Sequence, residues 1–230
     1  MIRRPRAARA KAPHPRDDGA GQPSDRLEIL LGKAARLMAK EGYHHTSMRD
    51  VARDASCSLA GLYHYFSSKE DLLFQVQHRV FASLLAAQEQ SLKAPGPLEE
   101  RLRLLVQNHL SFFTRHAAEL KVCTFELESL SGASYRRVEE LRRRYYRLVA
   151  DLVGELATRS GAAPSDVEVR RLTLFVFGIL NWIFMWFDPA RDTPIETLGD
   201  EIVNLVLYGL CGQRATTDAG QKSTALGLAG

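Results

Sequence analysis

The sequence predicts an all-α protein with a small N-terminal unit of three helices and a larger C-terminal helical bundle, about nine helices in all. Apolar residues recur at helical spacing through most of the chain, and no segment alternates as a strand does. Pro95-Gly96-Pro97 interrupts this helical pattern. With 45% hydrophobic residues, the 230-residue chain can bury a core, which excludes a disordered or fibrous protein.

The two ends of the chain lack apolar periodicity. Residues 1–23 are rich in Arg, Ala, Pro and Gly, and residues 213–230 in Gly, Ala, Ser and Thr. Such segments bury too little to become ordered, so both are expected to be disordered tails, the first of them basic. Between them we expect an N-terminal domain at 24–70 and a bundle at 71–212.

The first helix is expected at 25–40, where apolar residues form one face. Asp25 and Glu28 have the spacing of a capping box, and Gly42 provides the stop. The next three helices are expected at 47–55, 59–66 and 69–91.

Ser47 and Asp50 have capping-box spacing at the start of the second helix. Acidic residues occupy the first turn of the fourth helix. Ser56-Cys57-Ser58 forms a three-residue turn between the second and third helices. The bundle helices follow, at 98–114, 117–130, 134–159, 165–187 and 195–210.

Two short helices joined by a tight turn and supported by a longer helix make a helix-turn-helix. In this motif the second short helix enters the major groove of DNA while its inward side packs on the other helices. Leu62 and Phe66 are four residues apart and form the inward side. Tyr63 and His64 then lie largely outward, as do Leu59 and Ala60.

Across residues 26–76 the chain resembles the DNA-binding domain of the TetR (tetracycline-repressor-like) family of transcriptional regulators. The residues that carry the resemblance are Ala34-Ala35, Glu41-Gly42-Tyr43, Thr46-Ser47, Val51-Ala52, Ala55, Ser58, Leu62-Tyr63-His64-Tyr65-Phe66 and Ser68-Lys69-Glu70-Asp71-Leu72. The chain departs from the family at Ser56, where Gly is usual, and at Ala60-Gly61, where Gly-Thr is usual.

The resemblance implies a ligand-responsive repressor that binds a pseudo-palindromic operator in double-stranded DNA as a homodimer. The expected DNA-binding residues are Thr46, Ser47, Arg49, Ser58, Leu59, Ala60, Gly61, Tyr63, His64, Tyr65 and Lys69. Arg49 can read a guanine edge or touch only phosphate, and Tyr63 or Tyr65 can instead pack in the core. The basic tail can follow a minor groove or act only as a solubilising segment.

The resemblance places the dimer surface late in the bundle and a ligand pocket within it. The expected dimer residues are Phe175, Ile183, Ile195, Leu198, Ile202, Leu205 and Val206. The expected ligand-binding residues are Phe113, Cys123, Phe125, Tyr145, Phe177, Asn181, Trp182 and Trp186.

The ligand is expected to be a small hydrophobic effector. Gly178-Ile179-Leu180-Asn181-Trp182 and Trp186-Phe187-Asp188-Pro189 resemble the family members that respond to acyl-CoA thioesters. Arg142-Arg143-Arg144 can meet CoA phosphates, or form an ordinary solvated face.

Other classes of protein fit less well. The sequence has no H-E-x-x-H, no G-x-S-x-G and no phosphate-binding Gly loop, so we expect neither catalysis nor a cofactor. Three scattered cysteines favour a reducing cytoplasm and no cysteine metal site. The longest apolar run, 172–187, is shorter than the roughly 20 residues of a membrane span. A ligand-independent or nonspecific helix-turn-helix DNA-binding protein remains the alternative, and the net charge of +4 suits either.

Overall fold

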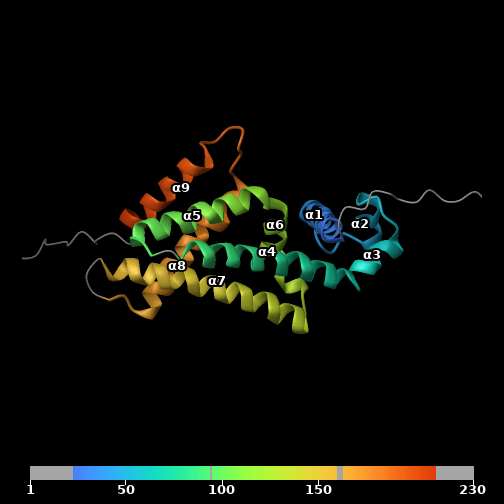
Figure 1. The fold of residues 1–230 in the computed structure, drawn as a ribbon, viewed down its shortest axis with the longest axis horizontal. Helices are drawn as coiled ribbons and strands as arrows, with labels where there is room; N and C mark the ends of the chain where they lie inside the picture. The colour runs from blue at the N-terminus through green and yellow to red at the C-terminus, as the bar shows by residue number, and fades with distance from the viewer. Residues whose placement is uncertain (1–22, 94, 160–162, 211–230) are drawn as a thin grey trace, which may run out of the picture.

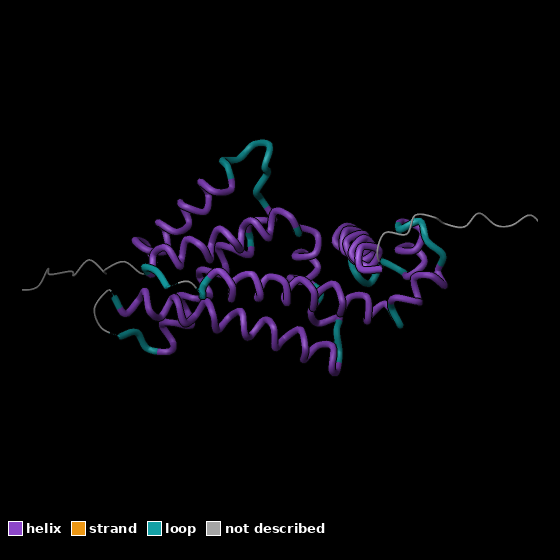
Figure 2. Tube along the Cα trace, in the orientation of Figure 1, coloured by secondary structure: helices purple, strands orange, loops and turns teal. Residues whose placement is uncertain are grey.

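The computed structural model describes residues 23–93, 95–159 and 163–210, which contain nine α-helices and no strand (Figures 1 and 2). The helices are α1 (Pro23–Glu41), α2 (Met48–Asp54), α3 (Leu59–Tyr65), α4 (Lys69–Ser91), α5 (Leu98–Arg115), α6 (Ala117–Phe125), α7 (Gly132–Thr158), α8 (Asp166–Asn181) and α9 (Ile195–Asn204). Two 3₁₀ turns, η1 (Leu127–Ser129) and η2 (Ile183–Met185), follow α6 and α8, and the π-helical segment η3 (Leu205–Leu210) follows α9. The all-α prediction is confirmed, whereas the predicted tails, apart from Pro23, lie outside the described residues.

Three predicted boundaries were wrong. α1 begins at Pro23, so Asp25 lies inside its first turn. The segments predicted as single helices at 117–130 and 165–187 each end early in a 3₁₀ turn. Apolar residues continue through both turns, so hydrophobic periodicity does not reveal the change of helix type.

The buried side chains form two cores joined by α4. Its first turns contribute Leu72 and Val76 to the core of α1–α3, and its later turns contribute Leu84 to the bundle core. Val122 of α6 and Val138 of α7 also pack in the N-terminal core. The α1–α3 unit at one end of the molecule is therefore packed directly against the bundle through shared side chains (Figure 1).

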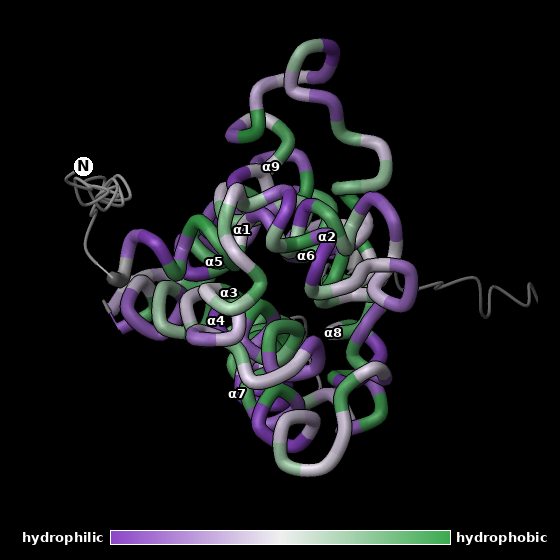
Figure 3. Tube along the Cα trace, turned by 90° about the vertical axis from the view of Figure 1, so that its right-hand side faces the viewer, coloured by the Kyte–Doolittle hydropathy of each residue, from purple (hydrophilic) through white to green (hydrophobic). Residues whose placement is uncertain are grey.

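Within the bundle, α4 packs along α7, α5 along α9, and α7 along α8, while α6 packs against α1. Viewed from the end that carries α1–α3, the helices alternate between hydrophobic and hydrophilic segments (Figure 3). This alternation is expected of amphipathic helices that bury one stripe each.

The turn between α2 and α3 contains a strained residue. Ser56 has φ of +51°, in the left-handed region, whereas the other described residues with positive φ are glycines, Gly42 and Gly132. For a residue that has a Cβ atom, the left-handed backbone conformation is unfavourable by roughly 1–2 kcal/mol. Ser56 stands where the TetR resemblance led us to expect glycine, so a left-handed conformation that suits glycine is adopted here by serine.

We expect Ser56→Gly to stabilise the protein by about 0.5–1 kcal/mol, because relief of the left-handed strain exceeds the added unfolded-state entropy of glycine. Denaturant unfolding measures the change. Ser56→Ala is the matched control and gives no gain, since alanine keeps the Cβ. Equal stabilities of the glycine and alanine variants would contradict the strain argument.

Candidate DNA-binding surface and effector cavity

The N-terminal ends of α2 and α3 are fixed by side-chain caps. Ser47 and Asp50 form the predicted capping box, with the Asp50 amide 3.2 Å from Ser47 Oγ and the Ser47 amide 3.1 Å from the carboxylate. Hydrogen bonds from Ser47 lower the pKa of Asp50, which keeps this carboxylate ionised in the cap. Ser58 caps α3 by accepting the Gly61 N–H at 3.0 Å. The caps orient both helices relative to the turn between them.

α3 has the inward and outward faces predicted from its sequence. Leu62 is fully buried, as is Phe66 just after the helix. On the opposite face, Ala60 and His64 are exposed and the Tyr63 side chain is 48% exposed. This outward face has the side chains and accessibility that a major-groove contact requires.

A groove runs beside α3 along the start of α2. Its walls come from the loop before α2, the first turn of α2, α3 and the start of α4, namely His44, His45, Thr46, Ser47, Met48, Arg49, Leu59, Tyr63 and Lys69. Arg49 is exposed, and no ion pair is found for its guanidinium among the described residues. An unneutralised Arg beside helix N-termini suits the phosphate backbone of DNA.

Lys69 and Thr46, both predicted to contact DNA, also make contacts within the protein. Lys69 Nζ donates to the carbonyl oxygens of Tyr43, at 3.0 Å, and Thr46, at 3.1 Å, and lies 4.2 Å from the centre of the Tyr43 ring. The Thr46 side chain is buried, and its hydroxyl donates to the Gly42 carbonyl at 2.9 Å. Both side chains are thus used to hold the loop before α2, which the sequence reasoning missed.

The same loop is also bonded to the bundle. The Tyr43 amide donates to Glu126 Oε1 at 3.2 Å, and Gln77 of α4 donates to the Glu126 carbonyl at 2.9 Å. Nearby, the Ser131 amide donates to Glu70 of α4 at 2.8 Å. The segment between α6 and α7 therefore contacts the N-terminal unit directly.

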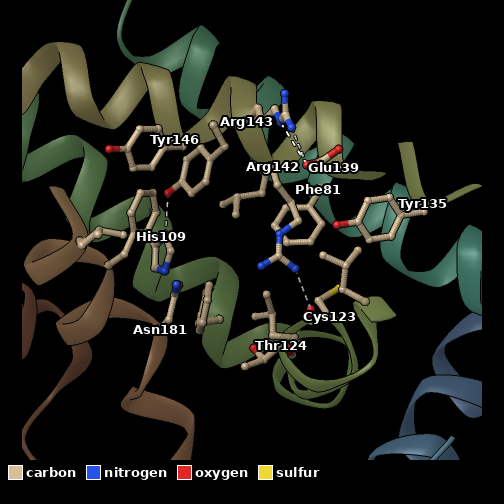
Figure 4. A pocket seen from close by; sticks show the side chains of 17 residues that line it. Phe81, His109, Cys123, Thr124, Tyr135, Glu139, Arg142, Arg143, Tyr146 and Asn181 are labelled. Carbon is tan, nitrogen blue, oxygen red and sulfur yellow. Dashed lines mark hydrogen bonds and ion pairs between the residues drawn. The ribbon is translucent and has the colours of Figure 1, made fainter. Parts of the chain in front are cut away.

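A cavity of about 440 Å³, open to the surface on one side, lies between α4, α5, α6, α7 and α8 (Figure 4). Its lining residues are Phe81, Leu84, His109, Phe113, Leu120, Cys123, Thr124, Leu127, Tyr135, Glu139, Arg142, Arg143, Tyr145, Tyr146, Leu174, Phe177 and Asn181. A mostly apolar enclosure with few polar groups is the usual form of a small-molecule site.

Five of the predicted ligand-binding residues line this cavity: Phe113, Cys123, Tyr145, Phe177 and Asn181. Phe125, Trp182 and Trp186 do not, which corrects the prediction for these three. Each is about half exposed, because α6 and α8 end near them and the chain turns away.

His109 is the most informative lining residue that the sequence reasoning missed. It is buried on α5, between Leu105 and Phe113 at helical spacing, so a histidine within an apolar stripe was the available signal. Burial raises the pKa of the Cys123 thiol, so this lining cysteine stays protonated.

Polar side chains lie along one part of the cavity wall. Arg142 donates to the Cys123 carbonyl at 3.1 Å, and its guanidinium lies over the Phe81 ring. Arg143 pairs with Glu139 at 2.7 Å (Figure 4). These two guanidinium groups are the cations among the residues that line the cavity.

The predicted dimer surface needs correction. Ile183, Leu198, Ile202 and Val206 are buried in the bundle core, where they fill space within one protomer and present no surface to another. Ile195 also packs partly against that core.

Phe175 and Leu205 are about half exposed, as predicted of interface residues. They belong to a larger set of exposed apolar side chains on α8, in and beside η2, and on η3: Val167, Phe175, Trp182, Met185, Trp186, Leu205 and Tyr208. We call this set the α8–η3 apolar surface.

Two further classes of site were searched for among the described residues. None of the described helices combines the length and apolar content needed to cross a bilayer. The described His, Cys, Asp and Glu side chains form no group suited to holding a metal ion.

Comparisons with known proteins identify both parts of the chain. A family model described as "Bacterial regulatory proteins, tetR family" matches residues 30–76, and one described as "Tetracyclin repressor-like, C-terminal domain" matches residues 95–210. The second match alone spans half of the chain.

The individual relatives have low sequence identity to this chain, but the similarity extends over nearly the whole length of each relative. The chain is 27% identical to the HTH-type transcriptional repressor KstR2 of Rhodococcus jostii, over 86% of this chain and 97% of that protein. It is 20% identical to the fatty acid metabolism regulator protein of Bacillus subtilis, over 79% of this chain and 93% of that one. The crystal structure of AibR in complex with isovaleryl coenzyme A and operator DNA superposes with a TM-score of 0.69, at 24% identity, over 78% of this chain and 97% of that one.

Proposed function

Because the chain belongs to the TetR family of DNA-binding transcriptional regulators, which are not enzymes, we propose that it is a repressor released from its operator by an acyl-CoA thioester. The observation that carries this proposal is the α4 helix, which begins at the groove beside α3 with Lys69 and lines the cavity with Phe81 and Leu84. Ligand and DNA therefore act on one continuous element.

The two kinds of cavity wall suit the two parts of an acyl-CoA. Apolar side chains such as Leu84, Leu120 and Phe113 suit an acyl chain, and Arg142 and Arg143 suit the phosphates of CoA. The names of two relatives support the same class, since AibR is described with isovaleryl coenzyme A and the Bacillus subtilis relative as a fatty acid metabolism regulator.

The α8–η3 apolar surface supports a homodimer. Large exposed apolar patches on a soluble protein mark interaction surfaces. A two-fold dimer presents two α3 helices to half-sites roughly 34–36 Å apart, which accounts for a pseudo-palindromic operator.

Release follows from the contacts between cavity and loop. Cys123, Thr124 and Leu127 line the cavity, and Glu126 between them accepts a hydrogen bond from the Tyr43 amide. A ligand that displaces this segment moves the loop before α2 and changes the separation of the two α3 helices. The ligand weakens DNA binding only to the extent that it prefers the displaced arrangement.

The proposal is tested by a thermal-shift panel of CoA thioesters and free acids, together with binding to the DNA upstream of the protein's own gene. We expect acyl-CoA thioesters to raise the melting temperature by mass action. We also expect upstream DNA to outcompete random DNA of equal length by about 10³-fold or more at fixed salt. Equal affinity for random DNA would instead favour the nonspecific helix-turn-helix protein.

Tyr63→Ala is expected to weaken operator binding by roughly tenfold, because an exposed ring on α3 loses its contacts with DNA at a cost of about 1–3 kcal/mol. Fluorescence anisotropy with labelled operator measures this loss, and sedimentation verifies that the dimer persists. Ile29→Ala, which truncates an equally exposed apolar side chain on α1, is the control. Unchanged affinity of the Tyr63 variant would show that α3 does not read the operator.

A further inference from the structure

One end of the effector cavity is polar although most of the wall is apolar. His109 of α5 and Tyr145 of α7 are both almost fully buried, and His109 Nδ1 lies 2.6 Å from the Tyr145 hydroxyl oxygen. The Asn181 side chain, at the end of α8, points toward the same imidazole (Figure 4). Polar groups buried beside a cavity need partners, and apolar residues would fill the bundle without that requirement.

The protons of this group can be assigned from its surroundings. Burial raises the pKa of Tyr145, against a hydrogen bond from Gln88, so the hydroxyl keeps its proton. Burial lowers the pKa of His109 to about 3, against the opposing effect of Asn181, so the imidazole is neutral at pH 7. In the tautomer in which the Tyr145 hydroxyl donates to Nδ1, the single imidazole proton is on Nε2.

The buried His109 Nε2 has no hydrogen-bond partner of ordinary geometry among the described residues, although the Asn181 side chain lies close to it. Rotation of the Asn181 carboxamide directs one of its own N–H groups to the same space. Two N–H donors that converge in this way are satisfied together by one carbonyl oxygen, which has two lone pairs.

We infer that His109 Nε2 and the Asn181 side-chain amide bind the thioester carbonyl oxygen of the effector, and that Tyr145 is a positioning residue that fixes the imidazole tautomer. This inference rests on the proposed function, because it takes the effector to be an acyl-CoA. The neutral imidazole brings no positive charge, which suits a thioester carbonyl better than a free carboxylate. The apolar wall that includes Leu84 and Leu120 is left for the acyl chain.

The test compares two probes that differ only at the carbonyl group. Hexanoyl-CoA carries the thioester, and S-hexyl-CoA is the thioether of the same chain length in which a methylene replaces the carbonyl. Isothermal titration of the full-length protein gives the affinity ratio of the two probes. We expect the wild-type protein to prefer the thioester by at least about tenfold, because a site built around hydrogen-bond donors rejects an analogue that lacks the acceptor.

Variants assign the preference to individual residues. His109→Phe and Asn181→Leu are expected to bring the ratio close to one while the thioether affinity changes little. His109→Gln keeps an N–H donor and restores part of the preference, and Tyr145→Phe reduces the preference without removing either donor. Retained operator binding verifies that each variant is folded. If His109→Phe does not fold, the inference is tested by the affinity ratios of the wild-type protein and of Asn181→Leu.

Two results would overturn the inference, and they are distinguishable. If the wild-type protein binds both probes equally, the carbonyl site is wrong while the acyl-CoA proposal stands. If neither probe binds to protein that still binds its operator, the acyl-CoA proposal fails, and the carbonyl site fails with it.

Discussion

Phe175→Asp is expected to convert the dimer to monomers and to lower operator affinity by about 10²–10⁴-fold, because each half-site then binds without the effective concentration that the partner subunit provides. Phe175 is 48% exposed on α8, within the α8–η3 apolar surface. At the proposed dimer interface, a charge in place of Phe175 removes an aromatic contact worth roughly 2–4 kcal/mol. Analytical ultracentrifugation measures the oligomeric state, and anisotropy measures the operator affinity.

Ile29→Asp is the matched control for this prediction. It places the same charge at an apolar side chain of similar exposure, 53%, on α1 and outside the α8–η3 apolar surface. The control is expected to remain dimeric. If the Phe175→Asp protein sediments as a dimer at micromolar concentration, α8 is not part of the dimer interface.

Lys69→Ala is expected to lower operator affinity by about 10–100-fold, since the loop before α2 loses bonds to charged donors worth roughly 1.5–3 kcal/mol each. Lys69 Nζ is bonded to the Tyr43 and Thr46 carbonyls, so its part is to hold this loop in place. The loss should therefore occur without a change in the salt dependence of binding. Anisotropy titrations over a series of salt concentrations measure both quantities.

Arg49→Ala supplies the comparison, because Arg49 is exposed at the start of α2 and free to meet phosphate. Removing one phosphate contact lowers the slope of log K against log salt by about 0.9. If Lys69→Ala lowers the slope as Arg49→Ala does, Lys69 contacts phosphate directly in the complex and the loop-holding role is wrong.

Local patterns predicted the helix-turn-helix well, because they depend on neighbours in sequence. Leu62 and Phe66 are buried together because they are four residues apart, and Ser47 and Asp50 cap α2 because a capping box needs only that spacing. The strained turn at Ser56 also forms, although the residue departs from the family pattern. Hydrogen bonds from the Ser56 amide to the Arg53 carbonyl, at 3.1 Å, and from the Cys57 amide to the Ala52 carbonyl, at 3.0 Å, hold this local conformation.

Contacts between distant segments were not predictable from one sequence. The apolar stripe of α9 was assigned to the dimer, but Leu198 and Ile202 pack in the protomer core, where α9 lies along α5. Periodicity shows that one face of a helix is buried and does not show what covers it. The exposed residue Leu205 lies beyond the end of α9, where the π-helical segment changes the direction of the side chains.

Only some of the residues that line the cavity were predicted, because the cavity is also formed by contacts between distant segments. Aromatic residues on α5 and α7 were expected to line it, and Phe113 and Tyr145 do. Trp182 was chosen by the resemblance to acyl-CoA-responsive relatives, but α8 ends at Asn181 and Trp182 lies outward. His109 was missed because its partner Tyr145 is 36 residues away on another helix.

The linkage between effector and operator is the property on which the whole account depends. The measurement is the affinity of the protein for its operator without and with a saturating acyl-CoA, and the affinity for the acyl-CoA without and with operator DNA. The account predicts that the acyl-CoA weakens operator binding by about 5–150-fold and that the operator weakens acyl-CoA binding by the same factor. Operator affinity that does not change while acyl-CoA occupies the cavity would contradict it.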